Sequence, residues 1–100
     1  MKFGLEDSTI SAINTVFAQF SDIKKAILYG SRAKGTFHAG SDIDLTLIAP
    51  TYNTDTILRI ENVLEDLMLP YKIDLSLLHQ IDSEELKEHI NRIGVTFYEK

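Results

Sequence analysis

Three aspartates are the residues of this sequence whose type and spacing are best suited to chemistry. Asp42 and Asp44 stand two residues apart in an apolar, β-branched stretch, and Asp74 stands in a later stretch of similar pattern. Side chains two apart on a strand point to the same face, with about 6.5–7 Å between their Cα atoms. Carboxylates that share a face repel one another, and magnesium relieves that repulsion because it prefers oxygen ligands. The pattern therefore predicts a Mg²⁺ site, with two ions as the expected arrangement.

A turn ten residues before the first aspartate has the features of a phosphate-binding segment. Gly30 ends an apolar run and permits close approach of the backbone to a ligand. Ser31 offers a hydroxyl and backbone N–H groups at a helix start. Arg32 and Lys34 add positive charge beside the turn. These four residues are the predicted nucleotide-binding residues of the chain.

The distribution of charge supports a small anionic ligand. The chain carries a net charge of −5, yet residues 24–41 contain four basic side chains and no acidic one. A cationic segment in an acidic chain favours binding of a small anion, whereas general nucleic-acid binding needs a broad basic face. The absence of cysteine and of a long apolar run predicts a soluble cytoplasmic protein without thiolate metal sites or membrane spans.

Short apolar segments and amphipathic helices must position these residues. Strands are expected at residues 25–29, 43–49 and 71–78, and residues 95–98 form either a small strand or a packing arm. Helices are expected after a cap at residues 7–9, over residues 31–35 and 54–69, and from a capping box at residues 82–85 to Gly94. Residues 1–100 are interpreted as one domain with an α/β layer.

The alternation within the strands predicts a two-sided sheet. Ile43 and Leu45 share one face, and the neighbouring aspartates share the other. We therefore expect helices to pack mainly on one face and the carboxylates to lie on an open polar face. Two further residues have ordinary interpretations: Tyr29 as a core residue, with stacking on a base as the alternative, and His89 as a residue at the boundary of a helix stripe.

The segments Gly30–Gly35 and Ser41–Leu45, with Asp74, resemble the signature of the polymerase-β-like nucleotidyltransferase superfamily. The similarity is greatest to its minimal nucleotidyltransferases and covers nearly the whole chain. It implies the nucleotidyltransferase fold, an α+β arrangement with a small mixed sheet and flanking helices. It also implies that Asp42 and Asp44 hold both metal ions, and that Asp74 holds the catalytic ion and helps to deprotonate the attacking hydroxyl.

The resemblance also implies a substrate and a partner. Gly30 and Ser31 would grip the triphosphate of ATP or another nucleoside triphosphate. Many minimal nucleotidyltransferases resemble MntA-like antitoxins of HEPN-domain toxins, and some add AMP to a toxin tyrosine. The chain is thus expected to be a metal-dependent enzyme that moves AMP to a hydroxyl of a HEPN-domain partner, with Mn²⁺ as the alternative ion. At 100 residues one domain leaves little chain for an acceptor site, so a partner or second subunit should supply it.

Two other functions remain open at this stage. The first is a nucleotidyltransferase of the aminoglycoside-modifying type, which acts on a small molecule and whose acceptor pocket a homodimer could provide. The second is a non-catalytic nucleotide-binding antitoxin that neutralises its partner by contact alone. Replacement of Asp44 separates them, because an enzyme loses turnover and a contact inhibitor keeps its protective effect.

Overall fold

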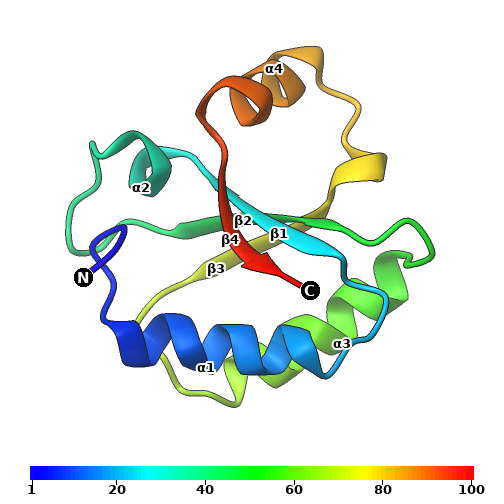
Figure 1. The fold of residues 1–100 in the computed structure, drawn as a ribbon, viewed down its shortest axis with the longest axis horizontal. Helices are drawn as coiled ribbons and strands as arrows, with labels where there is room; N and C mark the ends of the chain where they lie inside the picture. The colour runs from blue at the N-terminus through cyan, green and yellow to red at the C-terminus, as the bar shows by residue number, and fades with distance from the viewer.

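The computed structural model describes residues 1–100, which form a mixed sheet with the strand order β3-β2-β1-β4 (Figure 1). The strands are β1 (Lys25–Tyr29), β2 (Ile43–Ile48), β3 (Ile73–Leu77) and β4 (Val95–Glu99). β1 runs antiparallel to both β2 and β4, and β2 runs parallel to β3. The expected small mixed α+β sheet is confirmed, and the C-terminal segment is an edge strand rather than a packing arm.

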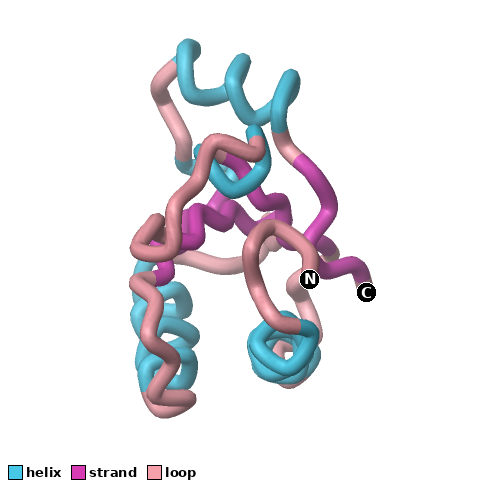
Figure 2. The backbone as a smooth tube through the Cα atoms, turned by 90° about the vertical axis from the view of Figure 1, so that its left-hand side faces the viewer, coloured by secondary structure: helices cyan, strands magenta, loops and turns pink.

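Helices lie on both sides of this sheet (Figure 2). They are α1 (Asp7–Ala18), α2 (Ser31–Lys34), α3 (Thr54–Glu65) and α4 (Glu84–Ile93), with a short 3₁₀ turn η1 (Leu78–Gln80). The two longest, α1 and α3, lie together on one side, as expected, while α2 and α4 lie on the other (Figures 1 and 2). α4 contacts β1 on this second side, so the polar face is covered in part. None of these helices combines the length and the apolar character needed to cross a bilayer.

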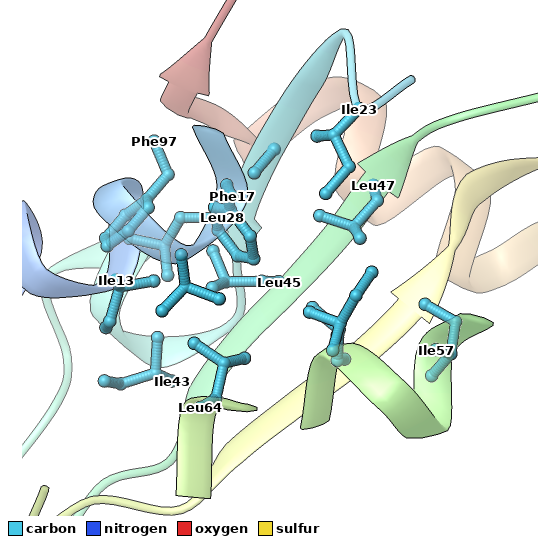
Figure 3. Packing of buried hydrophobic residues seen from close by; sticks show 14 of the residues in the cluster. Ile13, Phe17, Ile23, Leu28, Ile43, Leu45, Leu47, Ile57, Leu64 and Phe97 are labelled. Atoms are coloured by element: carbon cyan, nitrogen blue, oxygen red, sulfur yellow. The ribbon is translucent and has the colours of Figure 1, made fainter. Parts of the chain in front are cut away.

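The core fills the space between the sheet and the pair α1 and α3 (Figure 3). Leu45 and Leu47 of β2 are fully buried and stand opposite Leu28 and Ala26 of β1. Phe17 of α1 is fully buried against the same layer. Each such leucine or phenylalanine stabilises the fold by about 1.5–3 kcal/mol relative to an exposed position. The strand alternation thus fixes which side of the sheet is apolar and which side carries the aspartates.

Several element ends differ from the sequence-based expectations, most of them by one or two residues. α1 begins without a side-chain cap, because its N-cap residue is Glu6. α3 ends at Glu65, four residues earlier than expected, and Met68 in the following turn has a positive φ of 58°. The left-handed conformation of Met68 cannot continue the helix, and Pro70 disfavours helical backbone at Leu69, so the chain does not return to the helix before β3. The third strand is shorter than expected and begins at Ile73, because the chain still bends at Tyr71.

The expected signals at both ends of α4 are present, and the glycine at its C-terminal end acts for a different reason than expected. Ser83 caps the helix by accepting the N–H of Leu86 at 3.2 Å. Gly94 ends the helix with φ −58°, so a left-handed cap is not the reason for a glycine there. A Cβ at this position would overlap the carbonyl oxygen of Ile90 and lie 2.7 Å from a methyl group of Ile27. Gly94 therefore allows the end of α4 to approach β1 closely.

Candidate functional site

The three aspartates lie on the polar face at the end of the sheet where β2 and β3 begin. The parallel register places Asp44 directly opposite Asp74. Asp42 immediately precedes β2 and shares its face with Asp44, two residues on. Both ion pairs of the structure, Lys87–Glu84 and Arg92–Glu88, lie on α4, so no aspartate of this site has an ion-pair partner. The structure thus places the three predicted carboxylates on one face and at one end of the sheet.

The charges of these carboxylates affect one another. Burial raises the pKa of Asp44 above its ordinary value, and the negative charges of Asp74 and Asp42 raise it further. The nearby imidazole of His89 acts in the opposite direction and lowers this pKa. Asp44 is therefore the carboxylate at which the repulsion within the site is concentrated, and it would gain most from a bound cation.

The donor set fits a divalent cation, although the side chains do not converge on one point. No group of three or more histidine, cysteine, aspartate or glutamate side chains lies within the spacing of a metal site. Asp44 and Asp74 stand on adjacent paired strands, about 4.8 Å apart, so side-chain rotation is sufficient for them to share an ion. Their oxygens are the ligands that magnesium prefers.

The Gly30 turn packs directly against this acidic group. Gly30 has φ 76° and ψ −156°, a region of backbone conformation that is essentially restricted to glycine. A Cβ on Gly30 would overlap the carboxylate oxygen Oδ2 of Asp44. Ser31 follows as the first residue of α2 and is partly exposed. The predicted phosphate-binding turn and the predicted metal ligands are therefore in contact.

The structure places Arg32 differently from the expectation that it would add charge beside a phosphate. Arg32 is only 2% exposed, and its guanidinium donates hydrogen bonds to the carbonyl oxygens of Phe3 (2.9 Å) and Ser41 (2.9 and 3.2 Å). The rings of Phe37 and Tyr71 lie 5.3 and 5.0 Å from it. Because these contacts occupy the guanidinium, its observed role is to anchor the loop after α2.

Lys34 and His89 complete the surroundings of the turn. Lys34 is exposed and forms no ion pair, so its ammonium group is free to meet an anion. The α4 residue His89 accepts the backbone N–H of Gly30 through Nε2 at 3.0 Å. Sequence reasoning missed this contact, because the two residues are 59 positions apart and only the packing of α4 joins them.

Replacing Gly30 with alanine is expected to destabilise the fold by about 2–3 kcal/mol, since the backbone strain of this region adds to overlap with Asp44. Gly35 provides a matched control, because it also has a positive φ of 84° but no atom lies within 4 Å of an added Cβ. Gly35→Ala should cost about 1 kcal/mol from strain alone. Thermal unfolding of both variants measures the difference, and equal losses would contradict the close contact with Asp44.

The raised pKa of Asp44 predicts a pH-dependent penalty on stability. A carboxyl whose pKa is higher in the folded state favours folding while it is protonated, and this contribution is lost as the pH rises through the folded pKa. The Asp44→Asn variant should therefore match the wild type in acid and become the more stable protein toward neutral pH. Because Asp44 is partly exposed, the difference should stay below about 1 kcal/mol. Urea unfolding of both proteins at several pH values tests this. A difference in the free energy of unfolding that becomes smaller as the pH rises would contradict it.

Comparison with known proteins identifies the family of the chain. The family model described as polymerase beta, nucleotidyltransferase matches residues 11–100. No curated protein sequence matches the chain.

Several solved structures share the fold. A toxin–antitoxin crystal structure with AMP-PNP superposes with a TM-score of 0.72 at 22% identity, covering 96% of this chain and 75% of that chain. The MntA-HepT toxin–antitoxin superposes with a TM-score of 0.69 at 16% identity, covering 95% of this chain and 74% of that chain. A complex of a tri-AMPylated Shewanella oneidensis HEPN toxin with MNT antitoxin superposes with a TM-score of 0.70 at 16% identity, covering 96% of this chain and 74% of that chain. At these identities the likeness concerns the fold.

Proposed function

The chain belongs to the polymerase β nucleotidyltransferase family, and from this premise we propose that it transfers AMP from ATP to a hydroxyl of a HEPN-domain protein. It would act in the cytoplasm as the antitoxin of a toxin–antitoxin pair. The observation that carries the chemistry is the register that sets Asp44 opposite Asp74, with Asp42 on the same face. The partner is suggested by the shared fold with MNT antitoxins of HEPN toxins.

In this proposal the acceptor oxygen attacks the α-phosphorus of ATP, and the bond from that phosphorus to the bridging oxygen of the β-phosphate breaks. Pyrophosphate leaves, and Asp74 takes the proton of the acceptor hydroxyl. Gly30 and Ser31 orient the triphosphate beside the carboxylates. Lys34, which is exposed and unpaired, supplies positive charge to the phosphates.

The family generally uses divalent metal, and Asp42, Asp44 and Asp74 are the residues that would hold it here. Mg²⁺, with Mn²⁺ as the alternative, would supply positive charge that stabilises both the attacking and the leaving oxygen. The hard oxygen donors and their lack of ion-pair partners favour this assignment. Asp42 and Asp74 are exposed and Asp44 is partly exposed, so an acceptor hydroxyl from another molecule could reach the carboxylates.

The test is transfer of label from ATP to protein. The chain is incubated with α-labelled ATP, Mg²⁺ or Mn²⁺, and a HEPN-domain protein encoded beside it. Label is expected on the partner, at a hydroxyl side chain identified by mass spectrometry. If neither ion supports labelling, the protein-modifying function is wrong. Protection of the cell without labelling would favour neutralisation by contact, and labelling of an aminoglycoside instead would favour a small-molecule acceptor.

A further inference from the structure

The helix α4 makes a polar contact with the turn before the carboxylates. His89 accepts the N–H of Gly30 through Nε2 at 3.0 Å. Its ring also meets the ring of Tyr29 edge-on, with centroids 6.1 Å apart and an interplanar angle of 81°. Tyr29 is itself 7% exposed and stands opposite Asp44 in the sheet. His89 is therefore seated between a buried aromatic ring and the backbone of the turn.

Both backbone polar groups of Gly30 are held by helices. The N–H is bound by His89 of α4, and the carbonyl oxygen accepts the N–H of Lys34 in α2 at 3.0 Å. Glycine has no side chain to restrict rotation, so a turn built on it keeps one conformation only if its peptide groups are fixed. The contact of Gly30 with Asp44 adds a third restraint. Of these restraints, the bond from α4 alone comes from a side chain that belongs neither to the turn nor to the proposed metal ligands.

We propose that His89 is a positioning residue for nucleotidyl transfer, holding the Gly30 turn so that Ser31 faces the triphosphate. This inference rests on the proposed role of the turn. Loss of the acceptor would leave a partly buried N–H without a partner and free the peptide to rotate. Ser31 would then move relative to Asp44, whose own place on β2 is fixed by the sheet. The consequence is weaker nucleotide binding rather than slower chemistry.

The test compares His89→Leu with His89→Gln. Leucine keeps apolar bulk and removes the acceptor, whereas the glutamine side chain can return an oxygen to the place of Nε2. His89→Leu should raise KM for ATP, and the Kd of a non-hydrolysable analogue, about tenfold with little change in kcat. In His89→Gln, both KM for ATP and the Kd of the analogue should return most of the way to the wild-type values. Glu88→Gln, which breaks the exposed pair with Arg92 on the same helix, should leave KM unchanged.

A second measurement does not depend on catalysis. Hydrogen exchange of the Gly30 amide, followed by NMR, should be at least about tenfold faster in His89→Leu than in the wild type and should slow again in His89→Gln. Unchanged exchange and KM in His89→Leu would overturn the proposal, as would a glutamine variant as impaired as the leucine variant. If the wild-type chain transfers no nucleotide but exchange at Gly30 is still faster in His89→Leu, His89 holds the turn and the proposed function is wrong. The failure of one proposal can therefore be distinguished from the failure of the other.

Discussion

Asp44→Asn is expected to reduce nucleotidyl transfer at least about a thousandfold, with the fold intact. Asp44 has both other carboxylates as neighbours, with Asp42 just before the start of its strand and Asp74 directly opposite. It is therefore the one residue whose charge can act together with both neighbours. Asparagine has nearly the same shape but no negative charge, so it would weaken the hold on both ions that the site is proposed to bind.

The measurements are the rate of label transfer and the melting temperature without added metal. The melting temperature should stay equal or rise slightly at neutral pH, because the substitution removes a charge whose burial, together with repulsion from Asp74 and Asp42, raises the pKa of Asp44. Asp82→Asn is the matched control, since it makes the same chemical change at an exposed position before α4. Transfer that survives in Asp44→Asn, or falls equally in Asp82→Asn, would remove the basis of the proposed mechanism.

The arrangement of the carboxylates could be predicted from the sequence because it depends on local rules. Alternation in a strand assigns a face to each residue, and the tripeptide Ile-Asp-Leu occurs at both Ile43–Leu45 and Ile73–Leu75. When such strands pair in parallel with their apolar residues in step, the aspartates are opposite one another, as the structure shows. The sheet, the long helices and the face that carries the aspartates all follow from such short-range patterns.

The positions of Arg32 and His89 could not be predicted in this way. Arg32 bonds to the carbonyl of Phe3, 29 positions away, and His89 bonds to the amide of Gly30, 59 positions away. Neither partner has a side chain that marks it, because both contacts are made to the backbone. A basic residue beside a phosphate-binding turn has the same sequence pattern whether it faces the ligand or the interior. Only tertiary packing distinguishes the two cases.

Replacing Arg32 with methionine is expected to lower the free energy of unfolding by about 2–4 kcal/mol. The guanidinium donates to the carbonyl oxygens of Phe3, Ser41 and, at the longer distance of 3.5 Å, Ala39. Without it these acceptors lose their partner, and each unsatisfied buried group costs about 1–3 kcal/mol. Removal of a buried charge that has no carboxylate partner offsets part of this loss. For a domain of this size the melting temperature should fall by about 10–20 °C.

Lysine at this position should rescue little, because a single ammonium cannot reproduce the planar fork that reaches carbonyls from separate segments. Lys34→Met, which removes an exposed cation two residues away, should change stability by less than about 0.5 kcal/mol. Circular dichroism melts of the three variants test this order. If Arg32→Met has the melting temperature of the wild type but no longer binds ATP, the guanidinium contacts the phosphates and does not anchor the loop. Loss of a buried anchor lowers the melting temperature, whereas loss of a ligand contact weakens ATP binding. The quantity that changes in Arg32→Met therefore shows which role the guanidinium has.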